Sequence, residues 1–335
     1  DTANRQLAEH QRGAGLSVRQ SNLCSEILLP TGRDQHGRTR TAVCCLASVN
    51  LERWDEWCAE APFVEDVLRM LDNVLQDFIE RAPDSMAAAR YSAARERSVG
   101  LGAMGFHTYL QQNAIPFESA LARSANLPMF RHLRRAADAA SKRLAAERGP
   151  CPDAAERGVA ERFSHKLAVA PTASISVICG GTSACIEPIP ANVYTHKTLS
   201  GSFSVRNEAL QRLLAAKGLD SEATWQSILA HEGSVQQLDG LSEHEKAVFR
   251  TAFEIDQRWV VELAGDRAPL LCQGQSLNLY LNSDIHKWDL LMLHWTAWER
   301  GIKSLYYCRS KSVQRAGFAG VDADNEWSRH ETGAR

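Results

Sequence analysis

The sequence predicts an α/β fold built around a parallel sheet or barrel. Apolar segments rich in β-branched and small residues, such as 41–51 and 273–281, alternate with longer segments of helical periodicity. Strands that alternate with helices are typical of parallel sheets, because each helix returns the chain to the same end of the sheet. The 335 residues are 44% hydrophobic, which suffices for one large domain or two ordinary ones.

The individual elements follow from local pattern. Residues 1–20 are polar, and 31–40 form a turn-rich loop with two glycines. Strand character is strongest over 163–189, and another strand is expected at 302–308. Apolar residues at helical spacing predict four helices, over 62–81, 84–97, 116–148 and 286–301. Residues 205–263 are also predicted to be helical, with breaks near Gly218 and around 233–240.

Composition excludes several classes of protein. A net charge of −2 gives no electrostatic reason to expect binding to nucleic acid or to a membrane surface. No apolar run approaches the ~20 residues of a spanning helix, and the first residues do not form a signal peptide. Nine cysteines without a CxxC pair indicate reduced thiols in a cytoplasmic protein and no metal site. Since Asp1 is not a start methionine, we expect the chain to begin inside a longer protein.

One glycine-rich string resembles a dinucleotide-binding motif. Residues 98–105 contain GxGxxG at Gly100, Gly102 and Gly105, a pattern that favours dinucleotide binding when it follows a strand and opens a helix. Here the preceding residues Arg95, Glu96 and Arg97 are charged. The dinucleotide interpretation is therefore disfavoured.

The segment 21–30 carries the most informative polar residues. It places an amide, a thiol and a carboxylate at alternating positions, Asn22, Cys24 and Glu26. In an extended backbone these three side chains share one face, where they could address a vicinal diol. The alternative is a buried cysteine in a strand with two polar neighbours.

This segment resembles the thiyl-radical loop in the large subunit of class I ribonucleotide reductases. The resemblance runs in the family's order from about Arg19 to Ser312, through four more blocks: 42–51, 170–174, 186–188 and 303–307. It implies a ten-stranded α/β barrel of two five-stranded halves, of which this chain supplies the central thiyl-radical loop and the second half. The 98–105 string would then be a barrel strand and its turn, with glycines for close packing.

The resemblance also implies domain limits. Residues 1–20 would end an N-terminal half-barrel that lies upstream, 21–315 would form the thiyl loop and the C-terminal half, and 316–335 would be a mobile tail. Half a barrel leaves strand edges unpaired, so we expect the isolated chain to be inactive and prone to aggregate.

The resemblance implies a role for each residue of the loop. Cys24 would become the thiyl radical that abstracts the 3′-hydrogen of the ribose, Glu26 would accept the 3′-hydroxyl proton as general base, and Asn22 would hold the diol oxygens. Cys44 would be one of two thiols that reduce the substrate and end as a disulfide. Cys45 stays open as the alternative match, and the second thiol would lie upstream.

Two further blocks match binding and relay sites of the family. Thr172, Ala173, Ser174 and Ile175 match the loop that binds the substrate phosphates, although a helix N-cap without a ligand is the alternative. Tyr306 and Tyr307 match a stacked pair that passes the radical to the thiol. Because adjacent strand residues face opposite sides, stacking needs a local distortion, and ordinary core packing is the alternative.

The implied function is reduction of ribonucleotides, expected to be diphosphates, to 2′-deoxyribonucleotides for DNA synthesis. A tyrosine relay implies that the radical comes from a metal cofactor, di-iron or manganese-containing, in a separate small subunit, with no cofactor bound by this chain. Further expected partners are thioredoxin or glutaredoxin and a second large subunit. An adenosylcobalamin-dependent reductase and a non-catalytic nucleotide-binding paralogue remain alternatives. Glu187 stays open between a structural role and one near the substrate.

Overall fold

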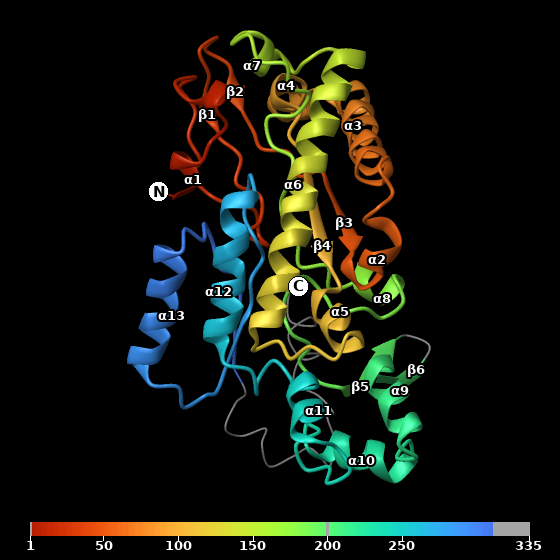
Figure 1. Cartoon of the computed structure of the whole chain (residues 1–335). Coiled ribbons are helices and arrows are strands. Elements are labelled where there is room, and N and C mark those ends of the chain that lie inside the picture. The colour runs from red at the N-terminus through yellow and green to blue at the C-terminus, as the bar shows by residue number, and fades with distance from the viewer. Residues whose placement is uncertain (1, 199–200, 311–335) are drawn as a thin grey trace, which may run out of the picture.

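The computed structural model describes residues 2–198 and 201–310, and its centre is a row of parallel extended segments (Figure 1). Strand β3 (Leu46–Asn50) pairs with β4 (Gly100–Met104), and β7 (Leu279–Leu281) pairs with β8 (Cys308–Ser310). Two parallel bridges, Leu101 to Leu167 and Val169 to Gln275, join these pairs. Five segments thus lie side by side, as expected for half of the barrel.

The glycines of β4 allow the row to pack closely. A Cβ atom on Gly102 would lie 2.3 Å from the carbonyl oxygen of Ala168, on the neighbouring segment. Gly105 has a φ of +82° and turns the chain from β4 into helix α5 (Phe106–Gln112). The 98–105 string is therefore a strand and a tight turn with glycines at close contacts, as the resemblance implied.

Long helices cover one side of the row. Helix α3 (Phe63–Arg81) packs against α6 (Ala120–Arg148), and α12 (Gln257–Arg267) packs against both α6 and α13 (Lys287–Glu299). Figure 1 shows α12 and α13 next to one another beside the lower half of α6. Their apolar faces and the strands form one hydrophobic core, because each amphipathic helix buries its apolar stripe against the sheet.

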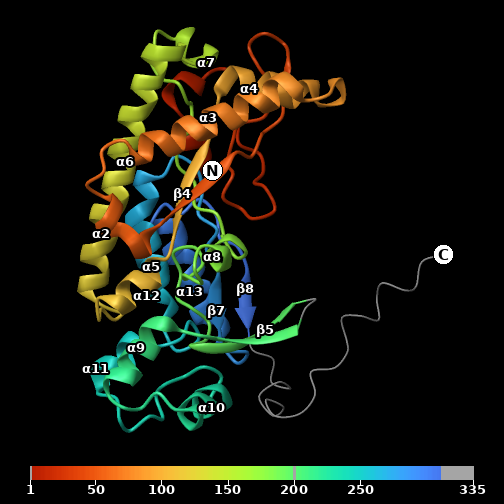
Figure 2. The same cartoon turned by 90° about the vertical axis from the view of Figure 1, so that its right-hand side faces the viewer.

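A smaller unit extends from this core. Helices α9 (Glu208–Ala216), α10 (Glu222–Ala230) and α11 (Glu243–Val248) bury a separate apolar cluster around Leu210, Leu214 and Trp225. The antiparallel strands β5 (Val193–Thr198) and β6 (Gly201–Arg206) join this unit to the barrel segments. Figure 2 shows β5 running out to one side of the molecule, away from the long helices.

The remaining elements are short. They connect the segments above and cover the ends of the row: α1 (Thr2–Arg5), η1 (Glu9–Gln11), β1 (Gly32–Arg33), β2 (Thr39–Arg40), η2 (Leu51–Arg53), α2 (Trp54–Trp57), η3 (Asp84–Met86), α4 (Ala87–Glu96), α7 (Pro152–Ala155), α8 (Ile175–Ile178) and η4 (Ala268–Leu270).

The structure confirms most helices and shifts several strands. The helices expected at 62–81, 116–148 and 286–301 form within four residues of their predicted limits. The strand expected at 302–308 is wrong in position, because regular pairing begins only at Cys308. In the β-rich stretch 163–189 only Leu167 and Val169 make bridges, and the chain then turns into α8. The tail 316–335 lies outside the described residues.

Candidate active site

The loop from Asn22 to Leu28 lies against two barrel segments. The backbone N–H of Gly274 donates to the carbonyl of Glu26 at 2.8 Å, and the N–H of Leu28 donates to the side chain of Gln273 at 3.2 Å. From the last segment, the Ser304 hydroxyl donates to the carbonyl of Ser25 at 2.6 Å. These contacts bring residues more than 240 positions apart in sequence to one place.

The loop is a closed turn, so the expectation of an extended segment with alternating side chains is wrong. Ser25 has a φ of +66°, and its N–H donates to the Asn22 carbonyl at 3.1 Å. The Asn22 side chain closes the turn, accepting from the N–H of Ile27 at 3.0 Å and donating to the Glu26 carboxylate at 2.9 Å. Asparagine favours such turns, because its short amide can bond to nearby backbone.

Glu26 sits at the centre of this turn with 2% of its surface exposed. One carboxylate oxygen accepts both from Asn22 and from the hydroxyl of Ser276, the latter at 3.1 Å. The Ser276 hydroxyl also lies within hydrogen-bond distance of the Cys24 carbonyl, and its single hydrogen serves one of these two acceptors at a time. A carboxylate held by two donors has a fixed orientation, which is what a general base needs.

The two adjacent cysteines of the second block have different surroundings. Cys45 is buried, and its thiol points to the Leu71 carbonyl on α3 at 3.6 Å. Cys44 is exposed as a residue, yet partial burial of its thiol and the nearby charges of Glu26 and Cys24 raise its pKa to about 11. Cys44 therefore lies within electrostatic reach of the loop and stays protonated near neutral pH.

The tyrosine pair continues from the loop. The rings of Tyr306 and Tyr307 are 4.1 Å apart between centroids and tilted by 39°. The Tyr306 hydroxyl donates to the Cys24 sulfur at 3.6 Å. Hydrogen bonds to Tyr307 and Cys24 raise the pKa of Tyr306 above its ordinary value. The three side chains form a contiguous row from the half-exposed Tyr307 to the thiol.

The 171–176 turn borders a cavity of about 380 Å³, which is also lined by Tyr306 and Glu187. Ala173 lines this cavity, whereas the hydroxyl of buried Thr172 accepts from the N–H of Cys185 at 2.7 Å. Ser174 and Ile175 are exposed, and the Ser174 side chain does not cap helix α8. The four predicted residues thus form one turn, but they do not all face the same space.

Bonded residues connect this turn to the thiol loop. The Cys185 thiol donates to the Ser276 carbonyl at 3.3 Å, while the Cys185 N–H holds Thr172. Since Ser276 also contacts the loop at Cys24 and Glu26, Ser276 links the turn to the loop.

Several residues of the site were not predicted from the sequence. Ser276, Ser304 and Asn278 touch the loop or the tyrosines, and Glu187 had been left open. A signal for Ser276 and Asn278 was present, because polar residues recur inside 273–281, a segment that otherwise indicates a buried strand. Buried polar side chains in a strand need partners, and these partners lie in the site.

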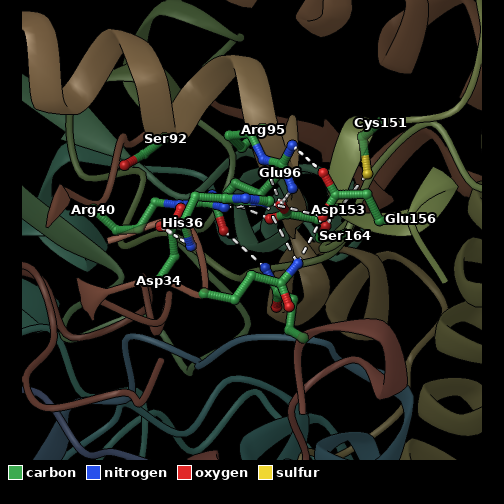
Figure 3. Close-up of polar contacts among 12 residues, drawn as sticks. Asp34, His36, Arg40, Ser92, Arg95, Glu96, Cys151, Asp153, Glu156 and Ser164 are labelled. Carbon is green, nitrogen blue, oxygen red and sulfur yellow. Dashed lines mark hydrogen bonds and ion pairs between the residues drawn. The ribbon is translucent and has the colours of Figure 1, made fainter. Parts of the chain in front are cut away.

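A second polar network joins the β1–β2 hairpin, α4 and α7 (Figure 3). Arg40 bonds to Asp34 and to both oxygens of Asp153, while Arg95 bridges Asp153 and Glu156. These bonds tie the β1–β2 hairpin to helices α4 and α7, which indicates a structural role.

The same network holds a buried acid. Glu96 accepts from Gln11 at 2.9 Å, and burial raises its pKa to about 7, against the opposing effect of Arg40.

Within residues 2–198 and 201–310, no group of three or more His, Cys, Asp or Glu side chains could hold a metal ion. Over the same described ranges, none of the helices combines the length and the apolar character that crossing a bilayer requires.

Comparison with known proteins agrees with this geometry. Residues 1–162 and 153–308 match the family model "Ribonucleotide reductase, barrel domain". Two relatives are 47% identical: the ribonucleoside-diphosphate reductase large subunit of Invertebrate iridescent virus 6, over 92% of this chain and 31% of the relative, and the putative one of Frog virus 3 (isolate Goorha), over 92% and 54%. The chain therefore spans about a third to about a half of these relatives.

A solved structure gives the same answer. The class Id ribonucleotide reductase alpha subunit of Actinobacillus ureae superposes with a TM-score of 0.85 at 36% identity, over 95% of this chain and 58% of that one. This structural similarity supports an α/β barrel fold, in which the five parallel segments form part of the barrel sheet. On the family match and this geometry together, the chain belongs to the ribonucleotide reductase barrel-domain family.

Proposed function

We propose that this chain carries the reaction centre of a class I ribonucleotide reductase large subunit, which reduces ribonucleoside diphosphates to 2′-deoxyribonucleotides through a thiyl radical. One observation carries the proposal: Tyr307, Tyr306 and Cys24 are in successive contact, and Glu26 and Asn22 lie in the same turn. A relay, a hydrogen-abstracting sulfur and a base at one place are what this chemistry requires.

The steps follow from the residues. The Cys24 thiyl takes the hydrogen atom from C3′, and Glu26 accepts the proton of the 3′-hydroxyl while Asn22 holds the diol. The C2′–O bond then breaks, and the oxygen leaves as water with a proton from Cys44, whose raised pKa keeps it a thiol. A second thiol outside this chain then gives a hydrogen atom to C2′ and joins Cys44 as a disulfide radical anion. The extra electron of that anion, with the proton returned by Glu26, reduces the 3′-carbonyl to the 3′-hydroxyl with the radical on C3′, and leaves the neutral disulfide. Cys24 returns its hydrogen to C3′.

We place the substrate phosphates at the 172–175 turn. The turn borders the cavity that Tyr306 also lines, and Gly180 and Gly181 have positive φ with open space around them. Hydroxyls and free backbone N–H groups beside open glycines suit an anion. Thr172 would act mainly by holding the turn in shape, since its hydroxyl is bonded to Cys185.

The partners follow from the relay. A small subunit with a di-iron or manganese-containing cofactor would supply the oxidising equivalent to Tyr307, which is 49% exposed. Thioredoxin or glutaredoxin would reduce the disulfide, and large subunits would associate with each other. An adenosylcobalamin-dependent enzyme needs no tyrosine relay, so the stacked pair favours the class I reading.

The test is Cys24→Ser in the full-length large subunit, assembled with its small subunit. We expect no deoxyribonucleotide, whereas ribonucleotide binding by equilibrium dialysis stays within about twofold, because a serine O–H bond is too strong to replace the thiol. Cys58→Ser, beside helix α2 and away from the site, is the matched control and should turn over normally. Undiminished turnover by Cys24→Ser would refute the radical role. Turnover that requires adenosylcobalamin instead of the small subunit would support the alternative class.

A further inference from the structure

The stacking of two adjacent tyrosines depends on a break in the β7–β8 ladder. In a regular parallel ladder, the N–H of Tyr307 would donate to the Leu277 carbonyl, because the N–H of Leu279 already donates to the Tyr307 carbonyl at 2.9 Å. That Leu277 carbonyl is instead occupied by the N–H of Tyr306, at 2.8 Å. Tyr306 thus takes the acceptor that Tyr307 would use in a regular ladder, and one extra residue is inserted into the strand, as in a β-bulge.

The displaced donor is satisfied by a side chain. The N–H of Tyr307 donates to the amide oxygen of Asn278 at 3.2 Å. Without this acceptor, Tyr307 would leave its N–H unbonded or return to the regular ladder. In the regular ladder, adjacent side chains face opposite sides of the strand, and the two phenol rings would separate.

Glu187 fixes the orientation of that amide. One of its oxygens accepts from the backbone N–H of Asn278 at 2.9 Å, and the other accepts from the side-chain Nδ2 at 2.7 Å. Both oxygens of Glu187 accept from Asn278, so the NH₂ group of Asn278 faces Glu187. The amide oxygen then points to the other side, where the N–H of Tyr307 lies.

Both members of this pair are buried, where polar groups are costly unless they are bonded. Asn278 and Glu187 are 4% and 5% exposed, and a buried carboxyl group is costly unless its bonds are well made. Burial raises the pKa of Glu187 to about 7, and the two bonds from Asn278 oppose that shift. The carboxyl group also lines the cavity beside Tyr306.

We propose that Glu187 and Asn278 are positioning residues that hold the bulge at Tyr306–Tyr307 and thereby keep both phenols on one side, stacked towards Cys24. The inference rests on the proposed function, in which the pair relays the radical. Neither residue touches the reacting atoms. They act through the backbone of Tyr307, and a misplacement of reacting groups by about 1 Å can cost about 10²-fold in rate.

An exchange of groups tests the pair in the full-length holoenzyme. Asn278→Asp sets two carboxyl groups against each other, and Glu187→Gln leaves one of the two Asn278 donors without an acceptor. In the double variant Glu187→Gln/Asn278→Asp, the glutamine can accept from the backbone N–H and donate to the aspartate. The other aspartate oxygen can then accept from Tyr307. All three bonds are restored, and only the bond between the two side chains has its donor and acceptor exchanged.

We expect each single variant to lower kcat by about tenfold or more with the KM for ribonucleotide within about twofold, and the double variant to recover most of the loss. Asn282→Asp, the same change at an exposed position four residues on, should leave kcat unchanged. A double variant no better than the single ones, or a loss confined to KM, would overturn the inference.

Tyr306→Phe separates this inference from the function on which it rests. If Tyr306→Phe turns over normally, no relay runs through the pair and the proposed function itself fails. If Tyr306→Phe is inactive while Asn278→Asp turns over like the unmodified enzyme, only the positioning role fails.

Discussion

Cys44 and Cys45 are neighbours in sequence with different surroundings. The Cys45 thiol is buried against the Leu71 carbonyl of α3, while Cys44 lies within the field of Glu26 and Cys24. The proposed chemistry therefore assigns the reducing thiol to Cys44.

We predict that Cys44→Ser lowers multiple-turnover deoxyribonucleotide formation by at least about 10²-fold, because a hydroxyl cannot form the disulfide. Cys45→Ser is the matched control and should retain turnover, with a loss of unfolding free energy of about 1–3 kcal/mol from the changed buried group. The measurement is product formation with thioredoxin as reductant, alongside urea unfolding. Loss of turnover in Cys45→Ser alone would reverse the assignment.

At this scale the sequence predicted which residues lie together better than it predicted their backbone geometry. Asn22, Cys24 and Glu26 were identified together, but the expected strand alternation was wrong, because the Asn22 amide closes a turn with its own neighbours. The need for a distortion at Tyr306–Tyr307 was foreseen. Its source, Asn278, could not be, since that contact joins residues 29 positions apart.

Strand β4 shows how a glycine pattern sets the spacing of an element. Gly102 faces the Ala168 carbonyl so closely that any Cβ would collide with backbone, which cannot rotate away. Burial of the whole strand leaves no room for the row to open.

Gly102→Ala should therefore lower the unfolding free energy by about 3 kcal/mol or more through overpacking against backbone. The control is Gly158→Ala, where φ is +69° and the added Cβ meets open space, so that only backbone strain of about 1–2 kcal/mol remains. Denaturant midpoints of the two variants in the full-length subunit give the comparison. Equal losses would mean that the close approach at β4 has no energetic weight.

Helices were easier to predict than strands for a physical reason. The apolar stripe of α3 spans 19 residues, and a stripe of that length has one periodicity that fits it. Barrel segments such as Leu167–Val169 are buried on both faces and paired over only a few residues, so their limits depend on neighbours far along the chain. The β5–β6 hairpin lies where no strand was predicted, and its last two residues fall inside the region predicted to be helical.

For the whole molecule, the network around Glu96 links the N-terminal segment to the barrel half (Figure 3). Burial raises the pKa of Glu96 to about 7, from an unfolded value of about 4.5, so the folded protein binds more protons than the unfolded chain between these values. The contribution of Glu96 to stability is thus fully present below about pH 4.5 and is lost as the pH rises through about 7.

Glu96→Gln should remove this term, so its unfolding free energy should fall less steeply from pH 5 to pH 7, by at most about 1.4 kcal/mol per pH unit. Exposed Glu60→Gln is the control and should keep the slope of the unmodified protein. The measurement is urea unfolding of the full-length subunit at several pH values. Identical slopes for Glu96→Gln and the unmodified protein would place the proton uptake elsewhere.

The outer segments of the parallel row leave strand edges that a further strand could cover. Each of β3 and β8 has one strand partner among residues 2–198 and 201–310, so the other edge of each strand presents unpaired backbone groups. Such edges recruit further strands, and in the family's barrel a second half would cover them. We therefore predict that the 335-residue chain alone is inactive and forms heterogeneous assemblies at micromolar concentration in size-exclusion chromatography with light scattering. The full-length subunit, with its edges covered, should elute as defined species under the same conditions. A monodisperse monomer of the 335-residue chain would mean that these edges are already protected by the residues at hand.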